Sequence, residues 1–252
     1  MKSRERDAES PVRPSGQTHT SEHNGDRQSA VDGNERMTAL AGAVLLVLIL
    51  VELVSAAILR TLLSIHVFVG VLLAGPLIVK LGSTGWRFLR YYTGSPAFVR
   101  RGPPHLALRV MAPLLIATTL VVIGSGIGLM VTGPRFAGPL LPLHGFSVLV
   151  WLPLIAIHVL AHIRRVPRLV TDDWSKPSDK NNASGRGRRL GMNLGALLAG
   201  VVAAILLFPG AAPWMVWSQT NETIPAPMIV GLLAAILALL VTRPWRLVGD
   251  GR

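Results

Sequence analysis

Cysteine is absent from all 252 residues of the chain. Its absence excludes disulfide bonds, covalent attachment of c-type haem, cysteine-ligated iron–sulfur clusters and zinc sites built on thiolates. Any metal in this protein must therefore be held by histidine, by a carboxylate or by the backbone, which directs attention to the seven histidines.

Charged residues are scarce as well: they make up 15% of the chain, whereas hydrophobic residues make up 50%. The apolar residues form long uninterrupted runs, without the alternation of strands or the spacing of amphipathic helices. Since about 20 apolar residues cross a bilayer as a helix, the sequence predicts an all-α integral membrane protein. We interpret the net charge of +12 as a mark of cytoplasmic loops, and expect contact with membrane lipid and not with nucleic acid.

The chain divides into four regions by composition. Residues 1–36 are polar and predict a disordered cytoplasmic tail. Six apolar runs follow, each long enough to cross a bilayer, and their ranges are 37–59, 62–81, 106–131, 143–163, 190–208 and 224–241. We expect six transmembrane helices: a four-helix bundle over 37–165, then a basic loop at 166–189 and a two-helix hairpin over 190–252.

The charges of the loops predict the orientation in the membrane. Basic residues are concentrated in the loops that follow the second and fourth runs, while the loops after the third and fifth runs carry few charges. The positive-inside rule therefore places both long basic loops in the cytoplasm. Because the number of runs is even, both termini are expected on the same, cytoplasmic side.

Four histidines lie within the apolar runs: His66 in the second, and His144, His158 and His162 in the fourth. Histidines inside a membrane are costly and usually have a function. His158 follows His144 by fourteen residues, which places them on nearly the same helix face, about 21 Å apart along the axis. His66 and His144 fall at matching depth near the outer ends of their spans. Two such imidazoles can ligate one haem iron from both sides, as in b-type cytochromes.

The inner half of the fourth run has no evident second ligand to oppose His158 and His162. Lys80 lies at the depth of His158 and could either neutralise a haem propionate or extend to the membrane surface. We therefore favour one outer haem b over two, and the inner site stays open. The alternative is that the intramembrane histidines only form hydrogen bonds within the bundle.

Three further residues are candidates for the cofactor site. Glu52 is the only acidic residue within a predicted span; it could receive protons, contact a quinone, hydrogen-bond an imidazole, or be a neutral group between helices. Gly70, one turn after His66, could leave room for a porphyrin or only permit close helix packing. Arg135, in a short outer loop, could meet an outward-pointing propionate or be solvated.

Several short motifs follow one another along 37–165. They are His66-x-x-x-Gly70, the segment Pro76-Leu77-Ile78-Val79-Lys80-Leu81, the segment Gly126-Ile127-Gly128-Leu129, and His144 with Trp151 and His158. This pattern resembles the bacterial membrane cytochrome b superfamily, which includes membrane subunits of formate dehydrogenases and nickel-iron hydrogenases. It is most similar to the membrane part associated with sulfite-oxidase-type molybdopterin oxidoreductases.

The resemblance implies a haem-binding bundle in the bacterial inner membrane. Such a subunit passes electrons between a quinone pool and a separate oxidoreductase subunit, here of the molybdopterin-dependent class. By position in the motifs, His66 and His144 would be ligands of an outer haem and His158 of an inner one. The di-haem members take a further ligand from the start of span one, where this chain has no histidine.

Two other functions compete with electron transfer. One is a haem-free membrane anchor subunit, and the other is a small proton-coupled transporter that uses Glu52 and the histidines as a relay. The two halves of the chain show no inverted repeat or paired broken helices that would favour transport. An enzyme acting alone is disfavoured, because the spans offer no nucleophile with a base and an orienting third group.

Overall fold

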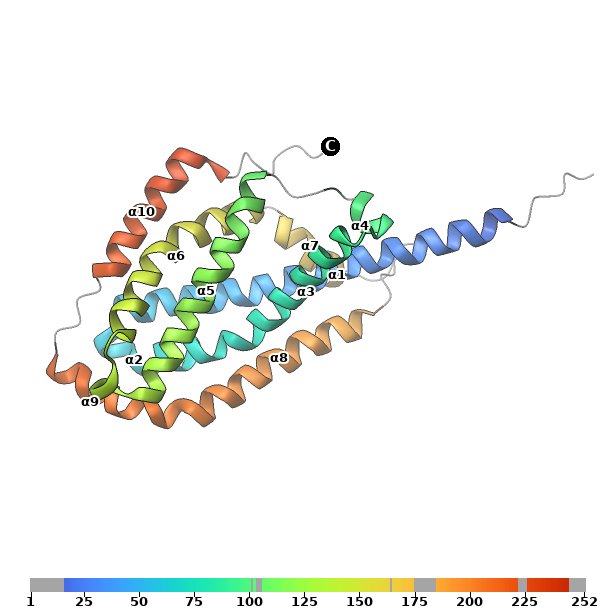
Figure 1. Cartoon of the computed structure of the whole chain (residues 1–252). Helices are drawn as coiled ribbons and strands as arrows, with labels where there is room; N and C mark the ends of the chain where they lie inside the picture. The colour runs from blue at the N-terminus through green and yellow to red at the C-terminus, as the bar shows by residue number, and fades with distance from the viewer. Residues whose placement is uncertain are drawn as a thin grey trace, which may run out of the picture.

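The structure is a computed structural model, and it describes residues 16–100, 102, 106–163, 165–174, 185–221 and 226–244. These residues form helices and no strand (Figure 1), which confirms the all-α prediction. The α-helices are α1 (Gly16–Ala57), α2 (Leu59–Leu72), α3 (Ala74–Tyr92), α4 (Pro96–Arg100), α5 (Leu106–Thr132), α6 (Leu140–His162), α7 (Arg165–Trp174), α8 (Arg186–Leu207), α9 (Ala212–Thr220) and α10 (Ala226–Thr242). Two short 3-10 helices, η1 (Pro134–Phe136) and η2 (Phe208–Ala211), follow α5 and α8.

Five helical stretches of the described chain are long and apolar enough to cross a membrane, namely Val31–Ala57, Leu59–Tyr92, Leu106–Thr132, Leu140–His162 and Arg186–Thr220. Their large apolar side chains are often exposed, for example Ile78, Val110 and Leu206, as expected where lipid tails surround a protein. The sixth predicted span corresponds to α10, which has 17 residues. At about 26 Å it falls short of a hydrocarbon core of about 30 Å, so the sixth crossing stays a prediction.

Two groups of helices face each other in the molecule (Figure 1). In one group α1, α2, α3 and α8 pack together, and in the other α6 lies between α5 and α10. The groups meet where Met130 of α5 joins Val71, Leu72 and Ala204 in a buried cluster. They also meet through α7, at the start of the predicted basic loop, which packs against α1.

The two helices of the predicted C-terminal region, 190–252, pack against different parts of the molecule. Helix α8 packs against α2 and α3, whereas α10 packs against α6 on the other side of the molecule. A Cβ added to Gly75 of α3 would lie 2.0 Å from the carbonyl oxygen of Ala196 in α8, and a Cβ added to Gly231 of α10 would lie 2.8 Å from the Leu152 side chain. Small residues thus fix each helix to a different partner.

Pro76, in the Pro-Leu motif of the second span, accounts for the boundary between α2 and α3. Helix α2 ends at Leu72, and Pro76 has no N–H to donate to the Leu72 carbonyl four residues before it. This carbonyl faces Gly200 of α8, where an added Cβ would lie 2.6 Å from the oxygen. The other glycines nearby in α8 make no such approach, since nothing lies within 4 Å of a Cβ at Gly191 or Gly195.

Helix α1 covers more than half of the predicted disordered tail, 1–36. Val31 is buried beside Phe98 of α4, and the buried Glu35 accepts a hydrogen bond from Arg87 of α3 at 3.4 Å. The prediction of disorder rested on polar composition. Composition does not show that a polar segment can continue an apolar helix where another helix packs alongside it.

Candidate cofactor site

A cavity of about 1200 Å³ lies between the two helix groups. It exceeds the roughly 300–1,000 Å³ typical of sites for small molecules, and its walls are mostly apolar. The predicted site residues that line it are Glu52, His66, Gly70, Lys80, His144, His158 and His162. Arg135 lies elsewhere, exposed on η1, so the expectation that it reaches the cofactor site gains no support.

The imidazoles of His66 on α2 and His144 on α6 face each other across this cavity. Their ring centroids are 6.3 Å apart and their planes meet at 77°. Because an imidazole nitrogen binds a metal at about 2 Å, two imidazoles on opposite sides of one metal have centroids roughly 6 Å apart. The structure brings the two histidines together, and their separation would suit two protein ligands of one iron.

Each of these imidazoles has a polar group against its Nδ1 atom. His144 Nδ1 lies 3.0 Å from the Val122 carbonyl oxygen and 3.0 Å from Ser125 Oγ. Since a carbonyl only accepts, we assign the ring proton to Nδ1, which leaves Nε2 free to bind a metal. His66 Nδ1 lies 3.1 Å from Glu52 Oε1. Support at Nδ1 is the common arrangement behind a metal-binding histidine.

The contact between Glu52 and His66 is close but not aligned as a hydrogen bond. His66 Nδ1 and Glu52 Oε2 are both buried, and neither has a hydrogen-bond partner among the described residues. Among the roles considered for Glu52, its position beside the ring nitrogen favours partnership with an imidazole.

Glycines leave room for these groups. A Cβ added to Gly70 would lie 3.1 Å from Glu52 Oε1, and one added to Gly126 would lie 3.1 Å from His144 Cε1. The space beside Gly70 was expected to admit a porphyrin. In the structure this space holds the carboxyl group of Glu52. Gly70 therefore affects the site by leaving room for Glu52 beside the His66 ring.

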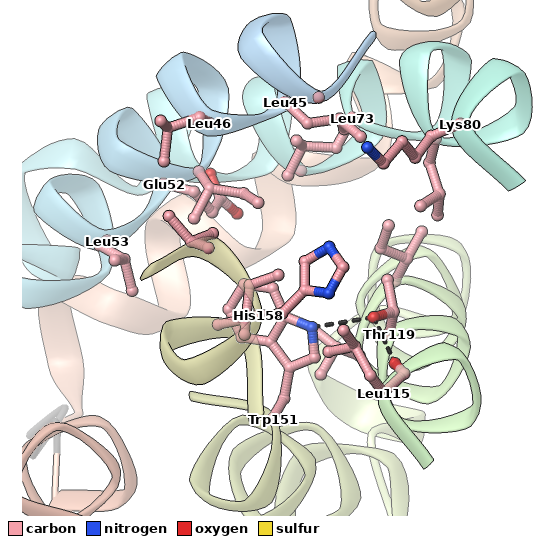
Figure 2. Close-up of a pocket in the computed structure, with 18 of the residues that line it drawn as sticks. Leu45, Leu46, Glu52, Leu53, Leu73, Lys80, Leu115, Thr119, Trp151 and His158 are labelled. Atoms are coloured by element: carbon pink, nitrogen blue, oxygen red, sulfur yellow. Dashed lines mark hydrogen bonds between the residues drawn. The ribbon is translucent and has the colours of Figure 1, made fainter. Parts of the chain in front are cut away.

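The other end of the cavity has a different composition. Figure 2 shows Lys80 and His158 reaching into the cavity from α3 and α6. Lys80 Nζ donates a hydrogen bond to the Thr38 carbonyl at 3.1 Å, so it is tied to α1. The rings of His158 and His162 lie 4.8 Å apart on one helix. Among the described side chains no other histidine opposes them, and His105 lies outside the described residues.

Sequence analysis missed the contribution of α5. Ser125 and the Val122 carbonyl support His144, and Thr119 accepts a hydrogen bond from Trp151 Nε1 at 2.9 Å (Figure 2). Ser125 stands between Gly124 and Gly126. The Ser125 hydroxyl could have been noticed, because it lies in an apolar span at the depth of His144. The role of the Val122 carbonyl could not, because every residue has a backbone carbonyl.

The donor atoms suit haem better than a bare metal ion. Within the described part of the chain, no three His, Cys, Asp or Glu residues come together as a group that could hold a metal ion. Haem iron already has four porphyrin nitrogens and needs only two protein ligands. No protein-family model, curated protein or solved structure matches the chain, and the resemblance to membrane cytochromes b stays a prediction.

Proposed function

We propose that this protein is a membrane b-type cytochrome subunit that transfers electrons between a quinone pool and a partner oxidoreductase. One haem b is held by His66 and His144. The observation that carries the proposal is the pair of imidazoles from opposing helix groups, 6.3 Å apart between ring centroids, each with a polar group behind its Nδ1 atom.

The residues of the site have separate tasks in this proposal. His66 and His144 would hold the haem through Nε2, and the bound haem would supply one-electron transfer. The apolar walls would exclude water from the bound group. Lys80 and His158 line the same cavity but lack an opposing histidine, which supports one haem and leaves an inner haem without a ligand pair.

The membrane arrangement belongs to the same proposal. Helices α1, α2 with α3, α5 and α6 surround the cavity as a four-helix bundle, α8 and α10 flank it, and α10 completes a sixth crossing. Both termini and the two basic loops lie in the cytoplasm of a bacterial cell, so His66 and His144 lie in the outer half of its inner membrane. The catalytic chemistry resides in a separate chain, of the molybdopterin-dependent class that the motifs imply.

The decisive experiment is a reduced-minus-oxidised absorption spectrum of the detergent-purified protein, with pyridine-haemochrome quantification of haem per chain. We expect a b-type spectrum and one haem, lost in His66→Ala and in His144→Ala. His158→Ala is the matched control, because it removes an imidazole from the same cavity and should keep the haem. A colourless but folded protein from haem-replete cells would contradict the proposal and favour a haem-free anchor or a proton-coupled transporter.

A further inference from the structure

The two proposed haem ligands differ in the groups behind them. Among the described residues, the partners of His144 are the neutral Val122 carbonyl and Ser125 hydroxyl, each at 3.0 Å from Nδ1. His66 has the carboxyl group of Glu52 at 3.1 Å. The two sides of the cofactor site are therefore electrostatically unequal.

Glu52 has no other described task. Its Oε2 atom is buried without a hydrogen-bond partner among the described residues, and the His66 ring is the polar group that its carboxyl contacts. The glycine at position 70 leaves space for Oε1, from which an added Cβ would lie 3.1 Å. A carboxyl group inside an apolar span is costly, and here the surrounding helices direct it onto one ring nitrogen.

We propose that Glu52 is a positioning residue that holds His66 with Nε2 toward the iron and makes this imidazole a stronger electron donor than His144. The inference rests on the proposed haem site. A carboxylate that accepts the Nδ1 proton increases the basicity of the ring. A more basic axial ligand stabilises ferric iron relative to ferrous iron, so Glu52 lowers the midpoint potential of the haem.

The test is a spectroelectrochemical titration of the haem-loaded full-length protein at one fixed pH, with electron paramagnetic resonance of the ferric state. Glu52→Gln keeps the shape of the side chain and replaces its carboxyl group by an amide. We expect it to retain haem, to shift the midpoint potential to more positive values and to change the ferric g-values. Ser125→Ala is the matched control on the opposite ligand, and should shift the potential less because the Val122 carbonyl remains.

Gly70→Ala provides a second and independent variant. It leaves both Glu52 and His66 intact but crowds Oε1, so it should shift the potential in the same direction as Glu52→Gln. If Glu52→Gln does not retain haem, the midpoint potential of the haem in Gly70→Ala decides whether Glu52 lowers that potential.

The outcomes separate the two proposals. An unchanged or more negative potential in haem-loaded Glu52→Gln, or in Gly70→Ala where that variant decides, would overturn the role of Glu52 and leave the His66–His144 site standing. A wild-type protein that takes up no haem would overturn the proposed function itself.

Discussion

The cavity has two ends that both contain imidazoles, and the comparison between them is instructive. At the His66 end, two rings come from opposing helix groups and each has a polar group close to its Nδ1 atom. At the Lys80 end, two rings lie one turn apart on the same helix and face a lysine. A ligand site for a flat cofactor needs donors on both faces of it, so the number of histidines alone does not define one.

Removal of one ring at the His66 end should have the largest effect. We expect His66→Ala to bind less than about a tenth of the wild-type haem, since loss of one strong ligand removes several kcal/mol of binding free energy. Added imidazole should restore part of the b-type spectrum by occupying the vacated space. Haem per chain in His66→Ala that equals the wild-type value without imidazole would contradict the importance of this end.

Crowding of His144 should have an intermediate effect. In Gly126→Leu the added side chain starts 3.1 Å from His144 Cε1, and overpacking of this kind typically costs about 1–3 kcal/mol. We expect haem affinity, measured by titration of the haem-free protein, to fall several-fold or more. Gly124→Leu is the matched control, because nothing lies within 4 Å of a Cβ at that position. Equal losses in both variants would contradict the placement of His144 beside Gly126.

A change at the Lys80 end should have the smallest effect. Lys80→Met keeps the unbranched side chain up to the position of Cε and removes the amino group with its hydrogen bond to the Thr38 carbonyl. If the two ends are independent, haem per chain should change by less than about twofold, because additive behaviour is expected for distant sites. Loss of haem in this folded variant would show that the two ends act as one site.

Much of the architecture followed from the sequence because hydropathy and helical periodicity are local properties. The apolar runs predicted the long helices, and the depth of His66 and His144 predicted their proximity. The support behind His144 could not be predicted in the same way, because it includes the backbone carbonyl of Val122, and every residue has a carbonyl.

The positions of the last two helices were beyond prediction for a different reason. Whether α8 and α10 pair with each other or with the bundle depends on contacts between residues far apart in the chain, such as Gly75 with Ala196 and Gly231 with Leu152. A glycine in a span signals a close approach but not the partner. The helical part of 1–36 was missed similarly, since its packing depends on α3 and α4.

The hollow between the two helix groups has a consequence for how the protein folds. Among the described residues they meet at buried clusters that join α2, α5, α8 and α9, and through α7 against α1, while a large hollow lies between them. Atoms that line a hollow lack the dispersion contacts of a packed interior, and a bound group that fills it adds its binding free energy to the folded state. Binding of a cofactor is then also a step of folding, because the bound molecule fills the hollow between the two helix groups.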